Sequence, residues 1–132
     1  MAVPEMEKHW EVIVHDDFLP EYRGLALAVQ NELVASAVIL REKGPILGRP
    51  QVDTLKGSRH ANMKELRFDA ADGVWRVAFA FDPKRNAVLL IAGDKSGGGE
   101  KRFYRQLIAR ADERFDEHLS RAQSKKKPKQ GT

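Results

Sequence analysis

Three cations, Arg67, Arg76 and Lys95, are the residues of this sequence whose types and spacing best suit binding to a phosphodiester. Arg67 and Arg76 lie in two stretches of alternating residues, and each points away from the large apolar side chains of its own stretch. Lys95 follows the next apolar run, where a loop can bring it to the same face. Guanidinium groups hold phosphate oxygens with a planar fork and stay charged, so these positions predict an anion site.

Strands are the elements that must position these cations. A period of two over Lys64–Phe68 and over Val74–Phe81 predicts two strands, with a hairpin turn at Asp72-Gly73 between them. A second turn over Asp82–Asn86 leads into Ala87–Ala92, which is apolar on both faces, as is typical of a central strand. The alternation therefore predicts a three-stranded antiparallel unit.

Two helical regions flank these strands. A β-rich run, Trp10–His15, predicts a first strand, and helical spacing over residues 22–40 follows it up to the breaker pair Gly44-Pro45. This helical region is either one long helix or two short ones broken near Gly24. Residues 46–61 are expected to form a loop-rich connector. A glycine-rich loop then precedes a helix that begins at Glu100.

The resulting order, β-α-β-β-β-α, predicts the α+β class, with a helix layer against an antiparallel sheet. Residues 1–119 are expected to form one domain. Residues 120–132 are polar and basic and are expected to be a disordered tail.

Composition excludes several classes of protein. The 132 residues are 42% hydrophobic and 32% charged, as in a folded globular domain. The sequence has no cysteine, which excludes disulfides and thiolate chemistry, and its histidines have no metal-ligand spacing. No signal pattern or membrane-spanning run is evident, so we expect a cytoplasmic protein without a membrane partner. A net charge of +4 favours an anionic partner.

Four strings in fixed order carry a resemblance to a known family: LKGSRHANMKELRF, VWRVAFAFD, AVLLIAGDKSG and KRFYRQLIARA. Together they resemble the RelE/HigB superfamily of bacterial toxins, and in particular its phage-derived HigB-like branch, over residues 10–119. The resemblance implies a curved antiparallel sheet with helices packed on one face and RNA held on the other, concave face.

The resemblance also implies a function: the toxin of a type II toxin–antitoxin pair, a metal-independent endoribonuclease that cuts mRNA on translating ribosomes and needs no cofactor. Its implied partners are mRNA, the ribosome and a cognate antitoxin of the helix-turn-helix type, with operator DNA bound only through that antitoxin.

RNA cleavage of this kind needs a base at the attacking 2′-hydroxyl, an acid at the leaving oxygen and cations around the phosphorus. By resemblance, Arg76 contacts the scissile phosphate, Lys95 is a second cation, and Tyr104 or Phe103 stacks on a base or transfers a proton. The lysines of the best-known RelE sequences are replaced by Met63 and Glu65. The base therefore stays open among Glu65, His60 and Asp94. The RNA-binding residues are expected to be Arg67, Lys64, Lys56, Arg59, Phe103, Lys101 and Arg102.

Structural alternatives stand beside these roles. Arg67 and Arg76 could form surface ion pairs with neighbouring carboxylates, and Tyr104 lies on the core stripe of its helix, which favours packing. A second apolar stripe of Leu27, Val34 and Val38 could bind an antitoxin or be buried within the same chain. Two other functions compete: a ParE-like poison of DNA gyrase with the same fold, and an inactive binding or regulatory module.

Overall fold

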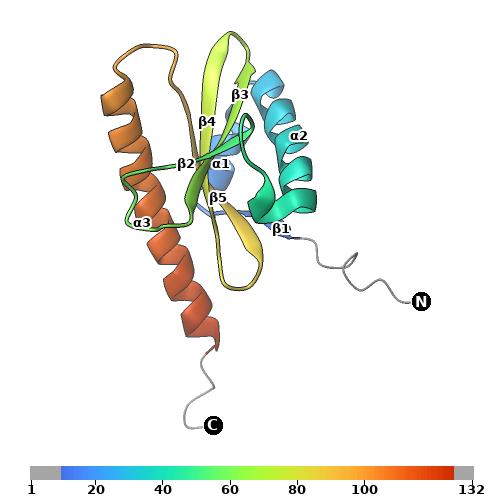
Figure 1. The fold of residues 1–132 in the computed structure, drawn as a ribbon, viewed down its shortest axis with the longest axis vertical. Coiled ribbons are helices and arrows are strands. Elements are labelled where there is room, and N and C mark those ends of the chain that lie inside the picture. Colours follow the sequence, from blue (N-terminus) through green and yellow to red (C-terminus); the bar gives the residue numbers. More distant parts are fainter. Residues whose placement is uncertain (1–9, 127–132) are drawn as a thin grey trace, which may run out of the picture.

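The computed structural model describes residues 10–126, which fold as a five-stranded sheet. Helices pack around this sheet (Figure 1). The elements, in chain order, are β1 (Glu11–Val14), α1 (Phe18–Arg23), α2 (Leu27–Lys43), the 3-10 helix η2 (Gly44–Ile46), β2 (Val52–Thr54), β3 (Met63–Ala70), β4 (Gly73–Phe81), β5 (Asn86–Asp94) and α3 (Glu100–Lys126). None of these helices is long and apolar enough to cross a membrane. The predicted α+β class is confirmed.

The sheet has the strand order β1-β5-β4-β3-β2. Strands β2 to β5 pair antiparallel, as predicted, whereas β1 pairs parallel to β5. Strand β2 lies within the stretch that we expected to be a loop-rich connector, because three residues are too few for a pattern of period two to be recognised. The β3–β4 turn is formed by Ala71 and Asp72, both at positive φ, one residue before the predicted pair.

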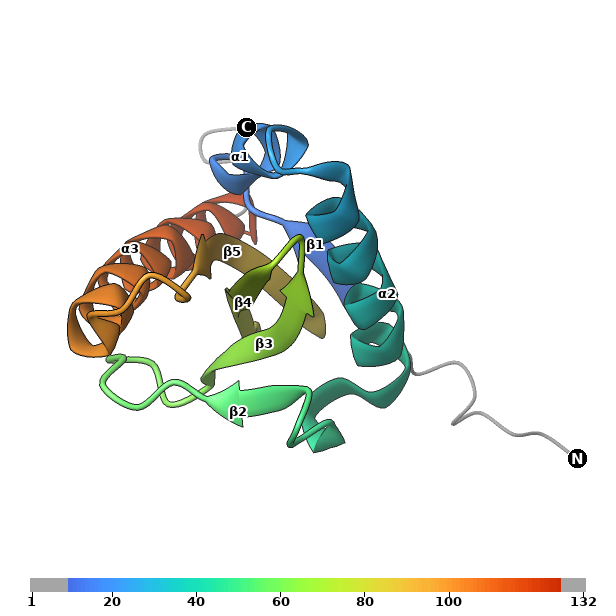
Figure 2. The ribbon, with the colours of Figure 1, turned by 90° about the horizontal axis from the view of Figure 1, so that it is seen from above.

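The helices cover both faces of the sheet (Figure 2), so the expectation of helices on one face only is wrong. Helices α1 and α2 pack on one face, where Phe18, Leu33 and Leu40 meet the strands. Helix α3 packs on the other face, where Leu107, Ala111 and Phe115 are buried. The expected open concave face is therefore covered by α3.

Several boundaries follow the predicted signals. The α1–α2 region is two helices, with Gly24 capping the first, and α2 ends directly before Gly44. Helix α3 begins at Glu100 as expected, but it continues to Lys126 instead of giving way to a disordered tail at residue 120. The rest of the proposed tail, residues 127–132, lies outside the described residues.

A bulge in the β4–β5 pairing decides which side chains reach α3. Ala78 pairs with Ile91 but Phe79 pairs with Leu89, so Leu90 is an extra residue in β5. Leu90 and Ile91 both pack against the α3 cluster, and after them Gly93 pairs with Arg76. The bulge thus places a glycine beside the predicted arginine, under the first turns of α3.

Candidate functional site

Arg76 lies on the α3 face of β4, opposite Trp75 and Val77, as the alternation predicted. It is nevertheless only 7% exposed. Its Nη1 donates to the backbone oxygen of Trp75 at 2.9 Å, and its Nε donates to the Tyr104 hydroxyl at 3.2 Å. Arg76 is therefore a buried cation that is linked to the candidate site by its hydrogen bond to Tyr104, and it is not exposed on the surface.

Tyr104 connects the cluster. Its hydroxyl accepts from Arg76 and donates to Glu65 Oε1 at 2.9 Å, so the three side chains form a continuous chain of hydrogen bonds. Burial raises the pKa of Tyr104 most strongly, Arg76 opposes that rise and Glu65 adds to it. The sequence favoured a packing role for Tyr104, but the structure places its hydroxyl in the candidate site.

Glu65 is 5% exposed, on the same face of β3 as Arg67. Desolvation raises its pKa above the ordinary glutamate value, although the hydrogen bond from Tyr104 and the charges of Arg76 and Arg67 oppose the rise. Its carboxylate lies 3.8 Å from Arg76 Nε and 3.8 Å from Arg67 Nε. A carboxylate whose pKa is raised towards neutrality is suited to act as a general base.

Lys95 follows β5, and its ammonium lies 5.7 Å from the centre of the Tyr104 ring and 3.5 Å from a Glu100 oxygen. The structure therefore brings it to the cluster, as predicted. Asp94 is exposed at the same turn, where it accepts from the backbone amides of Val74 and Ser96, and these bonds lower its pKa. A lowered pKa makes Asp94 a weaker base than Glu65.

A groove of about 600 Å³ opens beside Glu65 and Tyr104, between β2 and the start of α3. Lys56 and Lys101, both expected to bind RNA, stand on its rim together with Arg49. Sequence reasoning missed Arg49 and Asp53, which pair at 3.0 Å on this rim, and Asp53 also lies 3.7 Å from Arg67. Alternation could not reveal them because Asp53 lies within the unpredicted strand β2 and Arg49 lies just before it.

Other predicted residues lie elsewhere. His60 bonds to Asp116 at 2.7 Å, and Arg59 pairs with the same carboxylate. Asp116 follows Tyr104 by about three turns of α3, so the His60 group is separate from the Glu65 cluster. Lys64 lies on the opposite face of β3 from Glu65, away from the groove.

Arg102 is exposed in the first turn of α3, next to Lys101 on the rim of the groove. Its side chain is therefore open to solvent close to the place where we expect RNA to enter. This position agrees with the expected RNA-binding role, which stays a prediction.

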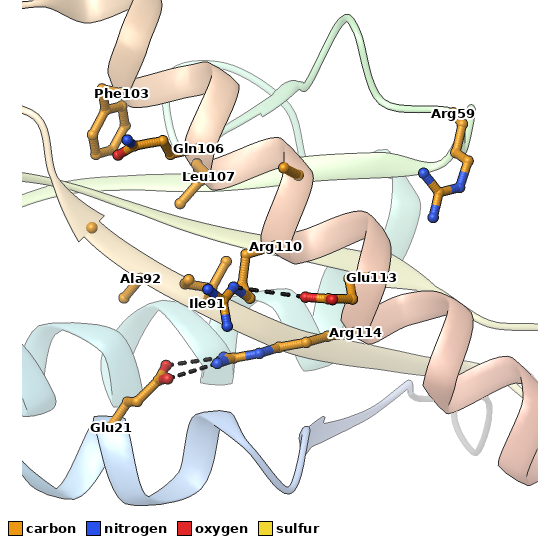
Figure 3. Close-up of a pocket in the computed structure, with 12 residues that line it drawn as sticks. Glu21, Arg59, Ile91, Ala92, Phe103, Gln106, Leu107, Arg110, Glu113 and Arg114 are labelled. Atoms are coloured by element: carbon orange, nitrogen blue, oxygen red, sulfur yellow. Dashed lines mark hydrogen bonds and ion pairs between the residues drawn. The ribbon is translucent and has the colours of Figure 1, made fainter.

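Phe103 packs inward, against the backbone of Gly93. Figure 3 shows its side chain beside Gln106 and Leu107 of α3. A Cβ at Gly93 would lie 2.8 Å from a ring carbon of Phe103, so only glycine permits this close approach. Phe103 also lines a groove of about 900 Å³ along α3. At the other end of this groove, Arg114 donates hydrogen bonds to Glu21 (Figure 3). Its ring is thus partly buried, in contrast to the free stacking surface that we expected.

Among the described residues, one group has the composition of a metal site: His15, Asp17 and Glu117, with ligand atoms within 4.8 Å of one another. His15 Nδ1 accepts the backbone N–H of Asp17 at 3.0 Å, which places the proton of a neutral ring on Nε2. Nε2 lies 2.9 Å from a Glu117 oxygen, without the alignment of a hydrogen bond. In this tautomer Nε2 has no lone pair for a cation, so the arrangement suits a contact between α3 and the start of α1.

Comparison with known proteins identifies the family of this chain. Residues 20–116 match the model of the phage-derived Gp49-like family. The chain is 48% identical over 97 residues to the candidate toxin HigB2 of Mycobacterium tuberculosis, covering 72% of this chain and 48% of that protein. It is 42% identical over 106 residues to the candidate toxin HigB3 of the same organism, covering 77% of this chain and 90% of that protein. The chain thus spans about half the length of HigB2.

Two solved structures share the fold. A double arginine-to-alanine variant of Escherichia coli toxin RelE in the free state matches with a TM-score of 0.56 at 12% identity, over 76% of this chain and 95% of that one. A chain of the archaeal RelE–RelB complex from Pyrococcus horikoshii matches with a TM-score of 0.50 at 16% identity, over 68% and 99%. The fold is that of the RelE/HigB superfamily. Within it, the chain belongs to the phage-derived Gp49-like family.

Proposed function

We propose that this chain is the toxin of a type II toxin–antitoxin pair and that it cleaves mRNA without a metal ion, during translation. The observation that carries the proposal is the chain of hydrogen bonds from Arg76 through Tyr104 to Glu65, at the edge of a groove with a cationic rim. The names of the HigB relatives support the toxin role. The RelE–RelB complex supports an antitoxin as the partner, for which we propose the helix-turn-helix type.

In the proposed reaction, the Glu65 carboxylate removes the proton of the 2′-hydroxyl, whose oxygen forms a bond to the adjacent phosphorus. The bond from phosphorus to the 5′ oxygen breaks, and Tyr104 donates its proton to that oxygen. Arg76 stabilises the resulting phenolate through its Nε–H, and Lys95 adds positive charge nearby.

The bond between Glu65 and Tyr104 also allows the site to reset. After one turnover Glu65 holds a proton and Tyr104 lacks one. At a separation of 2.9 Å the proton can return directly from the carboxyl group to the phenolate once the products leave. The acid and base are therefore restored without an external buffer. Substrate must enter between the two groups, because acid and base act on opposite sides of the phosphorus.

The test is to map RNA 5′ ends after brief induction in cells that lack an antitoxin, for the wild type and for Arg76→Ala. New ends in phase with codons, absent in the variant, are expected. Growth arrest without new RNA ends would exclude the nuclease and point to a gyrase poison. No arrest at all would point to an inactive module.

Antitoxin action needs a separate test. A candidate gene adjacent to that of the toxin is co-expressed with it, and relief of growth arrest together with co-purification is the expected result. A neighbouring gene that relieves the arrest without binding the chain would contradict the proposed partner.

A further inference from the structure

The outer face of α2 exposes apolar side chains that belong to neither buried cluster in the described part of the chain. Leu27 is 70% exposed, Val34 51% and Val38 50%, while Ile46, just beyond the helix, is 83% exposed. Three of these four belong to one stripe of α2, since positions 27, 34 and 38 are separated by seven and four residues. Large apolar side chains gathered on one helix face mark a surface that binds another protein.

This stripe lies away from the candidate site. Helix α2 covers the face of the sheet opposite to α3, which carries Tyr104 (Figure 2). Beside the stripe, Val34 and Val38 also line a groove of about 450 Å³ between α2 and β1. A partner bound here can place side chains in the groove without touching the Glu65 cluster.

The positions along the stripe, although not all of its residue types, coincide with one another when the direction of the helix is reversed. The outward positions are Leu27, Asn31, Val34, Val38, Arg41 and Ile46. Spacings of four, three, four and three residues up to Arg41 are those of a seam between paired helices. Inverted about Ser36, Val34 exchanges with Val38, Asn31 with Arg41, and Leu27 falls at Pro45, next to Ile46.

We propose that the outer face of α2 binds a second copy of this chain, with the two α2 helices antiparallel about a twofold axis that crosses the stripe midway between Val34 and Val38. A twofold interface requires a surface that is complementary to itself, and the inverted pattern meets this requirement. Val34 of each copy packs on Val38 of the other. Leu27 packs on Ile46 of the second copy at both ends.

Polar contacts fit the same arrangement. The Asn31 amide oxygen can accept from the Arg41 guanidinium of the second copy, which occurs twice because of the symmetry. Small side chains beside the seam, Ala28 and Ala35, are both exposed and allow the helices to approach closely. A parallel pair would instead place Arg41 against Arg41, which like-charge repulsion disfavours.

The oligomeric state of the purified 132-residue chain tests the proposal directly. Sedimentation equilibrium is expected to show a monomer–dimer equilibrium, and Val34→Asp should raise the dissociation constant roughly 100-fold or more, because the twofold axis buries the new charge twice. Ala109→Asp is the matched control, at an exposed position on α3. Because Val34 is half exposed, unchanged circular dichroism and melting temperature should show that the variant folds.

Cysteine pairing tests the orientation, since the sequence has no cysteine of its own. A mixture of Val34→Cys and Val38→Cys chains should form disulfide-linked dimers faster than either variant alone, because antiparallel helices bring 34 next to 38. Faster linkage within each variant alone would overturn the antiparallel arrangement. A monomer at all concentrations, or loss of antitoxin binding in Val34→Asp without any dimer, would overturn the proposal and assign the stripe to a different protein.

Discussion

Glu65 is 5% exposed, accepts a hydrogen bond from Tyr104 and has a guanidinium nitrogen of each of two arginines at 3.8 Å. Among the three candidates for the base, this environment favours Glu65. His60 is bonded to Asp116, in a different part of α3, and the amides around Asp94 lower its pKa. The placement of side chains thus separates residues that the sequence left equivalent.

Replacement of Glu65 by glutamine should slow RNA cleavage by about 10²- to 10⁴-fold, the usual contribution of a general base. The measurement is the initial rate of cleavage by purified protein. Asp69→Asn removes an exposed carboxylate farther along the same strand and should retain the wild-type rate. An equal loss of cleavage rate in Glu65→Gln and Asp69→Asn would contradict a specific role for Glu65.

Glu65 should also affect the pH dependence of stability. Burial raises its pKa in the folded state above the ordinary value of 4.5, so in that pH range the folded chain binds more protons than the unfolded chain. Its contribution to the free energy of unfolding therefore falls as pH rises from the unfolded pKa through the raised folded pKa. Chemical denaturation of wild type and Glu65→Gln at a series of pH values measures this difference. If the difference in the free energy of unfolding between the wild type and Glu65→Gln does not change with pH, the raised pKa of Glu65 is contradicted.

Among the secondary-structure elements, α3 is attached to the rest of the molecule by polar contacts along its inner side. Arg114, 5% exposed, donates to Glu21 of α1 at 2.9 and 2.6 Å and to the Leu90 backbone oxygen at 2.8 Å. Two further contacts, from Ser58 to Asp112 at 2.5 Å and between Asp82 and His118 at 2.8 Å, join α3 to the β2–β3 loop and to the end of β4. These contacts fix the orientation of the helix that carries Tyr104.

Truncation of Glu21 tests this attachment. Glu21→Ala should lower the free energy of unfolding by about 1–2 kcal/mol, because a buried guanidinium loses its partner, while the partial exposure of Glu21 limits the cost. Arg110→Ala is the matched control, since its pair with Glu113 is exposed and 3.8 Å long, and should change stability by less than about 0.5 kcal/mol. Urea denaturation measures both. A smaller loss of stability in Glu21→Ala than in Arg110→Ala would contradict the role of the Glu21–Arg114 pair in attaching α3.

Across the molecule as a whole, cations are gathered where the groove meets the start of α3. Lys101, Arg102 and Arg105 are exposed within two turns of that helix, and Lys56 and Arg49 stand across the groove. A single-stranded RNA that enters the groove therefore meets positive charge on both sides. Most of its affinity should come from counterion release.

Replacement of Lys56 and Lys101 by glutamine should reduce the salt dependence of RNA binding. Removal of one lysine–phosphate contact lowers the slope of log affinity against log salt by about 0.7 for a single strand. Binding is measured with the Glu65→Gln variant as the background, so that RNA is not cut. Lys84→Gln, at the exposed β4–β5 turn, is the control and should leave the slope unchanged. An unchanged slope in the double variant would exclude this groove as the RNA path.

The α+β class, the main strands and helices, and the pairing of Arg67 with Arg76 on one face could all be predicted from the amino-acid sequence. These features depend on local periodicity and on turn chemistry, which adjacent residues specify. The family was also recognisable, because its motifs occur in order over most of the chain. The apolar run Ala87–Ala92 already required cover on both faces of the sheet, although the resemblance led us to expect helices on one face.

The composition of the site, in contrast, depends on tertiary packing. Glu65, Arg76 and Tyr104 come from three different elements, and their contacts depend on the bulge at Leu90, on the close approach of Phe103 to Gly93 and on the packing of α3 across the sheet. Alternation assigns a side chain to a face, but it does not say which helix covers that face. For this reason the burial of Arg76, the hydrogen bonds of Tyr104 to Arg76 and Glu65, and the separate position of His60 could not be predicted from residue spacing.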